Sequence, residues 1–341
     1  MSKFKITTLG CKVNQAESEA IALDLLSSKW LTTRELEEAD LCIVNTCAVT
    51  QKAAMQSRQA VRRAIRANPN AQIVVTGCYA QTAPQEIEAI GGVSYIVGHG
   101  EKHTIGRMIR TAGDSAPGHT ISIGGDIRKK RPFAPMPIAN TIIRTRTFLK
   151  IQDGCDAFCT YCIVPHARGR SRSMPLADIV DNIGKLARAG YREVVLTGIH
   201  LGAYGHDLSP VTDLSTAMER IQESRPIDRV RLSSIEPFEF TGKVLEQALN
   251  SDIFCRHFHI PLQSGDAEIL KNMGRPYSPQ HFGDLIHKIH RFMPDAAIGV
   301  DALIGFPGES DSAFENTYGL IEKLPISYLH VFPFSARPGT K

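Results

Sequence analysis

Short apolar strands alternate with amphipathic helices along almost the whole chain, and this alternation is the feature that most restricts the fold. Such a pattern is typical of the α/β class, in which helices connect parallel strands. In the first part of the chain we expect strands at residues 5–9, 41–45, 72–76 and 95–97, with helices at 17–26 and 53–67 between them. This order predicts a doubly wound parallel sheet.

A second series of strands begins near residue 148. Strands are expected at residues 148–152, 193–197, 229–233, 257–261, 298–304 and 328–333. Helices fill most of the intervals, for example residues 176–188 and 313–323. Six strand–helix units of this kind predict a partial (β/α)6 barrel, whose chemistry is expected at the carboxyl ends of its strands.

Between these two series the alternation stops, and glycine and proline replace it from Gly113 to Pro137, together with a basic run at 128–131. We therefore expect a first domain at residues 1–112, a linker at 113–140 and a second domain at 141–341. The chain is 43% hydrophobic and 22% charged, which excludes a disordered or coiled-coil protein. It has neither an apolar run of membrane-spanning length nor a signal-peptide core, so we expect a cytoplasmic protein without a membrane partner.

Eight cysteines then need an explanation, because a cytoplasmic protein rarely uses them for disulfides. Cys155, Cys159 and Cys162, the first cysteine group, form a C-x3-C-x2-C pattern directly after a predicted strand. Three thiolates on one short loop suit three irons of a [4Fe-4S] cluster and leave the fourth iron open to S-adenosylmethionine (SAM), which can chelate it through its amino and carboxylate groups. The alternative is a zinc loop completed by a distant ligand, although structural zinc sites normally have four protein ligands.

The second cysteine group, Cys11, Cys47 and Cys78, is spread over the first domain, but each member lies just past the carboxyl end of a predicted strand. In a doubly wound sheet those ends open into one crevice, so we expect the three thiols to converge into a site. The alternative is that small thiols merely favour buried strand ends. Cys42 and Cys255 fit neither group and are expected in the core.

The loop from Cys155 to Cys162, including Tyr161, resembles the signature of the radical SAM superfamily. Residues 196–199, 259–265 and 299–309 resemble, in order, the glycine-rich turn, the strand-four segment and the strand-five segment with which that superfamily contacts SAM. The residues that this resemblance implies for SAM binding are Tyr161, Thr197, Gly198, Ser234, Glu236, Gln263, Ser264 and Asp301.

The two cysteine groups together resemble the radical SAM methylthiotransferases, which carry an extra cluster domain at the amino terminus. The resemblance includes residues 155–172, 233–237 and 270–277 and covers essentially the whole chain. Residues 8–15 (Thr-Leu-Gly-Cys-Lys-Val-Asn-Gln) are similar to the branch that acts on N6-threonylcarbamoyladenosine in tRNA. Family members usually continue into a small carboxyl-terminal β-domain (TRAM), which we expect to be absent here, so independent tight tRNA binding is not expected.

The resemblance implies two [4Fe-4S] clusters, one on each cysteine group. The first would pass an electron into SAM, and the second would hold the sulfur that becomes a methylthio group at C2 of N6-threonylcarbamoyladenosine, beside the tRNA anticodon. An electron donor such as a flavodoxin or ferredoxin is implied as well, whereas the sulfur donor is not identified. The alternatives are methylthiolation of isopentenyladenosine in tRNA or of a ribosomal protein side chain, and a non-enzymatic iron–sulfur or zinc module that binds RNA.

A net charge of +4 does not by itself indicate an RNA-binding protein, so the local charge matters more. Arg168, Arg170 and Arg172 closely follow the first cysteine group. A protein that neutralises the phosphates of RNA needs a cluster of basic residues such as this one. We therefore expect these three arginines to contact the tRNA, although for any single arginine a solvated surface position is the simpler alternative.

Overall fold

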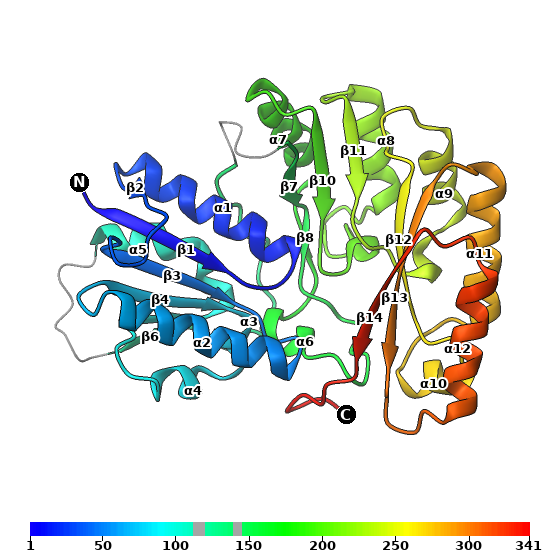
Figure 1. The fold of residues 1–341 in the computed structure, drawn as a ribbon. Coiled ribbons are helices and arrows are strands. Elements are labelled where there is room, and N and C mark those ends of the chain that lie inside the picture. Colours follow the sequence, from blue (N-terminus) through cyan, green and yellow to red (C-terminus); the bar gives the residue numbers. More distant parts are fainter. Residues whose placement is uncertain (112–119, 139–144) are drawn as a thin grey trace.

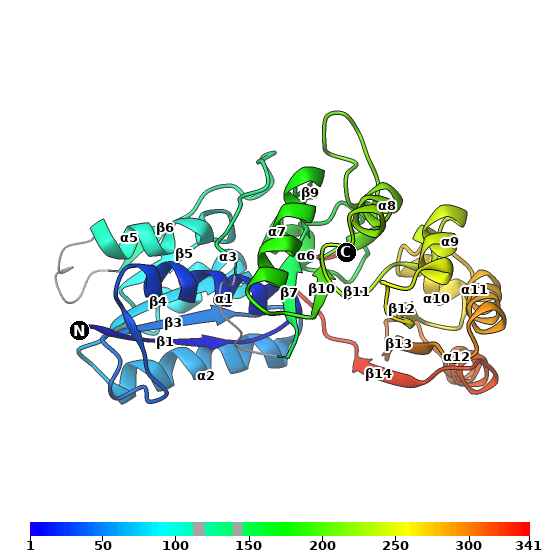
Figure 2. The ribbon, with the colours of Figure 1, turned by 90° about the horizontal axis from the view of Figure 1, so that it is seen from above.

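The structure is a computed structural model that describes residues 1–111, 120–138 and 145–341. It contains two α/β domains that lie side by side (Figure 1, Figure 2). Within the described residues, the amino-terminal domain has one parallel sheet in the order β2-β1-β3-β4-β5-β6. Its strands are β1 (Lys3–Thr8), β2 (Leu31–Thr32), β3 (Leu41–Thr46), β4 (Gln72–Gly77), β5 (Tyr95–Val97) and β6 (Ile121–Ile123).

Helices cover both faces of this sheet. They are α1 (Lys12–Ser27), α2 (Gln51–Ala67), α3 (Cys78–Thr82), α4 (Pro84–Glu88) and α5 (Ile105–Thr111), with the 3-10 helix η1 (His99–Thr104) before α5. Val74 of β4 is buried against α1 and α5, whereas its neighbour Val75 is buried against α2, α3 and α4. Since consecutive residues of a strand point to opposite faces, this burial confirms the doubly wound sheet. Cys42 is 1% exposed and lies in the core, as predicted.

One segment of the expected linker belongs to the sheet. β6 pairs in parallel with β5, and the amide of Gly98 donates a hydrogen bond to the carbonyl of Ile123 at 2.7 Å. The sequence did not indicate this strand within the predicted linker, because three residues are too few for a periodic pattern to be recognised. The linker residues 113–119 and 139–140 lie outside the described residues.

The second domain forms an arc of parallel strands. Its two three-stranded sheets have the orders β7-β10-β11 and β12-β13-β14, and a parallel bridge between Val230 and Phe254 connects them. The strands are β7 (Thr147–Lys150), β10 (Glu193–Thr197), β11 (Arg229–Leu232), β12 (His257–Gln263), β13 (Ala297–Ile304) and β14 (Tyr328–Pro333). This open arc confirms the partial barrel.

Helices pack on the outer face of the arc (Figure 2). They are α7 (Leu176–Arg188), α8 (Leu214–Ser224), α9 (Gly242–Asn250), α10 (Ala267–Asn272), α11 (Pro279–Phe292) and α12 (Asp311–Lys323). Each of α8, α11 and α12 begins at an Asp or Ser whose side chain accepts a hydrogen bond from a first-turn amide. Among the described residues, no helix has the length and the apolar composition that crossing a membrane requires.

Alternate residues of the barrel strands face either the helices or the lumen of the arc. Val194, Val230 and Val300 are buried in the core beneath the helices. Their strand neighbours Glu193 and Asp301 therefore point to the opposite side, into the lumen. The lumen side of the barrel is where charged and polar side chains gather, and it is also where the amino-terminal domain contacts the barrel.

Gly77 ends β4 and leads directly into Cys78, with a backbone φ of +98° that favours glycine. A Cβ at this position would lie 2.4 Å from the carbonyl oxygen of Thr46.

We expect Gly77→Ala to lower the free energy of unfolding by at least about 2 kcal/mol, as measured by urea denaturation. The matched control is Gly91→Ala, where φ is +72° but no atom lies within 4 Å of the new Cβ, and it should cost about 1 kcal/mol. Equal losses in the two variants would contradict the role of the contact with Thr46.

Candidate active site

The first cysteine group lies on the loop between β8 (Gln152–Asp153) and α6 (Val164–Arg168), at the carboxyl end of the first barrel strand. β8 pairs antiparallel with β9 (Arg172–Ser173), which closes the base of this loop. In the middle of the loop, the amide of Thr160 donates a hydrogen bond to the carbonyl of Met273 at 3.0 Å. The loop is therefore attached both to its own base and to the segment that follows α10.

A cavity of about 370 Å³ lies between this loop and the amino-terminal domain. All three residues of the first cysteine group line it, and so do Val49 and Thr50, which follow Cys47 of the second group. Four residues predicted to bind SAM also line it: Tyr161, Glu236, Gln263 and Asp301. Its volume is in the range of ligand-binding pockets.

Two of these lining residues are held in defined positions. The pairing of β12 with β13 changes register between Pro261 and Gln263, and Gln263 adopts a φ of +66°. A non-glycine residue in this left-handed conformation is uncommon and is often found at functional sites. Asp301 Oδ1 is hydrogen-bonded to His259 Nε2 at 3.0 Å and to His330 Nδ1 at 3.1 Å.

Thr197, the last residue of β10, and Gly198, in the turn that follows, are both predicted to bind SAM. Neither residue lines the cavity. Thr197 is 1% exposed. Gln152 Oε1 accepts hydrogen bonds from the amides of Ile199 and His200, at 2.9 and 2.8 Å, and so holds the turn against the cysteine loop. Ile199 and His200, rather than their predecessors, face the cavity. Binding of SAM by Thr197 and Gly198 stays a prediction.

Ser234 and Ser264, also predicted to bind SAM, are turned toward other side chains. Ser264 is completely buried, its hydroxyl lies 3.2 Å from that of Thr317, and it accepts a hydrogen bond from the amide of Asp266 at 3.1 Å. These contacts hold the Ser264 side chain in the protein interior, and the binding of SAM by Ser264 stays a prediction. The hydroxyl of Ser234 is hydrogen-bonded to Nδ1 of His259, beside Asp301.

Sequence reasoning missed two cationic residues that touch the first cysteine group. Arg275 is 9% exposed, donates a hydrogen bond to Sγ of Cys159 at 3.2 Å and pairs with Glu236. His200 Nδ1 lies 3.5 Å from Sγ of Cys155, and its Nε2 lies 2.8 Å from Glu239. Burial lowers the pKa of His200, but the hydrogen bonds to Cys155 and Glu239 outweigh it and raise the pKa to about 10. The only sequence signal was that His200 directly follows the segment 196–199, which resembles a SAM-binding motif, and that Arg275 lies within the segment 270–277, which resembles the methylthiotransferases.

The second cysteine group converges at the carboxyl edge of the first sheet. Cys11 precedes α1, Cys47 follows β3, and Cys78 begins α3. A Cβ on Gly10, next to Cys11, would lie 3.0 Å from Sγ of Cys47. Burial raises the pKa of Cys47 to about 11, with further contributions from Cys78 and Cys11. The strand ends thus bring Cys11, Cys47 and Cys78 to one edge of the sheet, and their convergence into a metal site stays a prediction. The remaining cysteine, Cys255, is only partly buried rather than in the core.

A buried network of charges connects the two domains. Arg168 of α6 is 1% exposed and lies 2.8 Å from Asp153 and 3.3 Å from Glu17 of α1. It also donates a hydrogen bond to the side-chain carbonyl of Asn14 at 2.6 Å. Glu17 pairs further with Lys102 at 2.5 Å and with barrel residue Lys150 at 2.8 Å. These cations hold the pKa of Glu17 well below its usual range despite complete burial.

This network overturns part of the predicted RNA contact. Arg168 and Arg172 are both buried, and Arg172 pairs with Asp153 at 2.7 Å, so neither presents its guanidinium to a phosphate. The error arises because a basic residue in a motif is read by default as a surface residue. Arg170 alone is exposed, with 66% of its side chain accessible, and its contact with tRNA stays a prediction.

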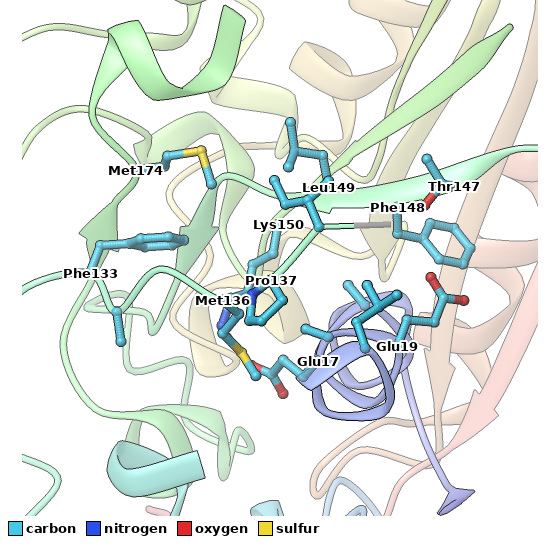
Figure 3. Close-up of a pocket in the computed structure, with 15 residues that line it drawn as sticks. Glu17, Glu19, Phe133, Met136, Pro137, Thr147, Phe148, Leu149, Lys150 and Met174 are labelled. Carbon is cyan, nitrogen blue, oxygen red and sulfur yellow. The ribbon is translucent and has the colours of Figure 1, made fainter. Parts of the chain in front are cut away.

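The interface between α1 and β7 also contains a cavity of about 50 Å³ (Figure 3). Phe133, Met136, Leu149 and Met174 supply much of its lining, and Glu17 borders it. This volume holds one or two water molecules and no substrate. We interpret it as a packing gap in the domain interface.

Both cysteine groups have the donors and the charges that a [4Fe-4S] cluster requires. Burial raises the pKa of Cys162 to about 12, so this thiol needs a metal ion or a nearby cation to be deprotonated. Arg275 and His200 supply positive charge beside the first group. Beside the second group, burial raises the pKa of Cys78, and the positive charge of Arg168 opposes this by lowering it. The residues present therefore fit a cluster at each site.

Comparisons with known proteins agree with this arrangement. Residues 3–98 match the uncharacterized protein family UPF0004, and residues 149–321 match the Radical SAM superfamily. The chain is 41% identical to the threonylcarbamoyladenosine tRNA methylthiotransferase MtaB of Bacillus subtilis, over 100% of this chain and 75% of that protein. The chain belongs to the radical SAM methylthiotransferases. It is a transferase that uses SAM and [4Fe-4S] clusters.

Other relatives of this methylthiotransferase are also named for methylthio chemistry on tRNA. MtaB of Aquifex aeolicus is 35% identical over 99% of this chain and 82% of its own length. A tRNA-2-methylthio-N(6)-dimethylallyladenosine synthase of Clostridium botulinum is 33% identical over 100% of this chain and 76% of its own length. Among solved structures, the radical SAM methyltransferase TsrM of Kitasatospora setae superposes with a TM-score of 0.67 at 17% identity, covering 98% of this chain and 75% of that one, which supports the fold.

If Arg168 holds the domains together, removing its charge should destabilise the protein strongly. Arg168→Leu leaves Glu17 and Asp153 with fewer cations at a buried site, and we expect it to lower the free energy of unfolding by about 3 kcal/mol or more. The matched control, Arg170→Leu, removes an exposed guanidinium two residues away and should change it by less than about 0.5 kcal/mol. Urea denaturation of both variants measures the difference, and similar small losses would contradict the role assigned to Arg168.

Proposed function

We propose that this methylthiotransferase inserts a methylthio group at C2 of N6-threonylcarbamoyladenosine, beside the anticodon of tRNA. The observation that carries the proposal is that one cavity is lined by the first cysteine group and by the residues that follow Cys47 of the second. A reaction that needs both groups can take place only if they open into one space. The names of the Bacillus subtilis and Aquifex aeolicus relatives support this nucleoside as the substrate.

In this proposal Cys155, Cys159 and Cys162 hold one [4Fe-4S] cluster, and Cys11, Cys47 and Cys78 hold the other. The chemistry that these groups supply when bound is reductive cleavage of SAM to a 5′-deoxyadenosyl radical and delivery of sulfur to the activated purine carbon. Both steps require an enclosed, preorganised site, because a carbon radical reacts with whatever is nearby.

The residues of the chain have positioning and electrostatic roles in this reaction. Arg275 and His200 offset the negative charge of the thiolates in the first group. Glu236 fixes the guanidinium of Arg275 and itself lines the cavity. Asp301, held by two histidines, and Gln263, held in its left-handed conformation, face the same space and are assigned to SAM.

The alternatives differ in how well the observations favour them. Methylthiolation of dimethylallyladenosine is the second candidate, because a relative of that name is 33% identical over the whole chain. A ribosomal protein substrate has no such support, and the enzyme family excludes a purely RNA-binding module. We propose a cytoplasmic setting with a flavodoxin or ferredoxin as electron donor, and the sulfur donor is left open.

Nucleoside analysis tests the substrate directly. The protein, reconstituted anaerobically and supplied with SAM, reductant and sulfide, is incubated with tRNA that contains either N6-threonylcarbamoyladenosine or dimethylallyladenosine. We expect a methylthio derivative of the first nucleoside and at least about tenfold less of the second, by mass spectrometry of the digested tRNA. Preferential modification of dimethylallyladenosine would replace this proposal by the second candidate.

Two cysteine variants test whether the two groups are separate centres. Cys159→Ala should abolish formation of 5′-deoxyadenosine from SAM, because the first group cleaves SAM. Cys47→Ala should retain most of that cleavage but lose the thiolated nucleoside. Cys255→Ala, outside both groups, is the matched control and should retain both activities. Loss of both activities to the same extent in Cys47→Ala would contradict separate roles.

A further inference from the structure

Helix α2 carries positive charge and no negative charge. It contains no Asp or Glu, and its basic residues are Lys52, Arg58, Arg62, Arg63 and Arg66. Every other helix of eight or more residues in the described part of the chain (α1, α7, α8, α9, α11 and α12) contains at least one acidic residue. A helix face that only meets water typically mixes charges of both signs, so the composition of α2 points to a partner.

Four of these basic residues share the side of the helix that faces solvent. Lys52, Arg63 and Arg66 are separated by eleven and three residues, which is close to three turns and one turn of an α-helix. Arg62 lies beside this row, and all four residues are exposed. The opposite side, which includes Val61, is buried against the sheet. We call these four residues the basic face of α2.

No carboxylate neutralises the basic face. Among residues 1–111, 120–138 and 145–341, none of its four cations forms an ion pair with an acidic side chain. Arg58, on the flank of the helix, differs from them, because it pairs with Glu86 at 3.1 Å and donates a hydrogen bond to the hydroxyl of Tyr79 at 2.6 Å. The internal contacts of the protein therefore account for Arg58 but not for the basic face.

The helix begins at the cavity that contains the first cysteine group. Val49 and Thr50, directly before α2, line this cavity. The amide of Gln51, the first residue of α2, donates a hydrogen bond to Ser335, which lines it as well. From there α2 runs along the amino-terminal domain, away from the barrel (Figure 1, Figure 2). Its 17 residues span about 25 Å, so the basic face leads from the rim of the cavity along the surface of the molecule.

The length of the basic face limits which anion fits it. A small anion can contact only one or two of its cations, whereas the backbone of a nucleic acid presents a regular series of phosphates. Arginine binds phosphate through two parallel hydrogen bonds. α2 has no aromatic residue on which a base could stack, so the face suits the sugar–phosphate backbone rather than base edges.

We propose that the basic face of α2 binds the phosphate backbone of the anticodon arm and so orients the modified adenosine toward the cavity. The inference rests on the proposed function and adds the surface that holds the rest of the tRNA. When the adenosine beside the anticodon enters the cavity, the nucleotides next to it must pass over the rim at which α2 begins. An acidic electron donor is the other partner of suitable charge. RNA is favoured because α2 runs away from the first cysteine group, which an electron donor has to approach.

The salt dependence of tRNA binding tests the proposal. Fluorescently labelled tRNA is titrated with the reconstituted protein, without SAM, between about 50 and 200 mM salt. The variant Arg62→Gln/Arg63→Gln/Arg66→Gln removes three charges but keeps a good helix former at each position. We expect at least about tenfold weaker binding at the lowest salt concentration. The slope of log Kd against log salt concentration should fall by about 2, because each phosphate contact contributes roughly 0.7 to it.

A matched variant separates a specific surface from a general loss of charge. Three exposed cations on the helices that cover the barrel are replaced by Gln: Lys185 and Arg188 of α7 and Lys243 of α9. The net charge falls by the same amount, yet the affinity for tRNA should change by less than about threefold. Iron content and circular dichroism, measured for every variant, verify that the clusters and the helices are retained.

Photo-crosslinking identifies the part of the tRNA that lies on the basic face. p-Benzoylphenylalanine in place of Gln59, an exposed residue between Lys52 and Arg63, should crosslink to nucleotides of the anticodon arm. The same group in place of Asp181, an exposed residue of α7, should give no crosslink. Crosslinks from position 59 that are confined to another arm of the tRNA would overturn the inference.

The remaining outcomes distinguish this inference from the proposed function. If the α2 variant binds tRNA as tightly as the control variant, or if the wild-type protein does not bind tRNA in this salt range, the inference is wrong. It is equally wrong if the α2 variant binds tRNA normally but loses affinity for reduced flavodoxin, since the face then holds the electron donor. Preferential modification of dimethylallyladenosine would overturn the proposed nucleoside but not this inference, because both tRNAs have the same backbone.

Discussion

The buried guanidinium of Arg168 is the interaction on which the arrangement of the two domains depends. It belongs to the barrel domain, yet it contacts Glu17 and Asn14 of α1 as well as Asp153 of its own domain. An ionic group buried at an interface is stable only while its partners remain in place, and breaking such a pair costs several kcal/mol. The domains therefore have little freedom to rotate or separate. Because the positive charge of Arg168 also lowers the pKa of Cys78, the same residue links the domain interface to the second cysteine group.

Fixing the interface has a direct consequence for chemistry. Parallel sheets place their functional residues at the carboxyl ends of the strands, so each domain by itself offers one open edge with three thiols. Two such edges can cooperate only when they face each other across a space of molecular size. The cavity between the cysteine loop and residues Val49 and Thr50 provides that space. A further contact joins the two domains beside this cavity, because the amide of Gln51 donates a hydrogen bond to the hydroxyl of Ser335 at 2.9 Å, and Ser335 lines the cavity.

Properties that depend on local sequence could be predicted, whereas those that depend on distant partners could not. The strands and the first cysteine group could be recognised from periodicity and spacing within a few residues, whereas the second group was predicted from the expected order of the strands. β6 was missed, since its three residues acquire strand character only by pairing with β5. The roles of Arg168, Arg275 and His200 were also missed, because a basic residue reveals neither its burial nor its partner until the chain is folded. Ser264 illustrates the same point, because its hydroxyl lies against that of Thr317, a residue far away in the sequence.

The placement of charge in the lumen also bears on how one scaffold can serve different nucleosides. Relatives named for threonylcarbamoyladenosine and for dimethylallyladenosine align with the whole of this chain, and both names describe methylthio chemistry. The residues that hold the clusters can therefore contribute little to the choice of substrate. That choice must come from groups facing the N6 substituent, where a carboxylate needs a cation and a hydrocarbon needs its absence.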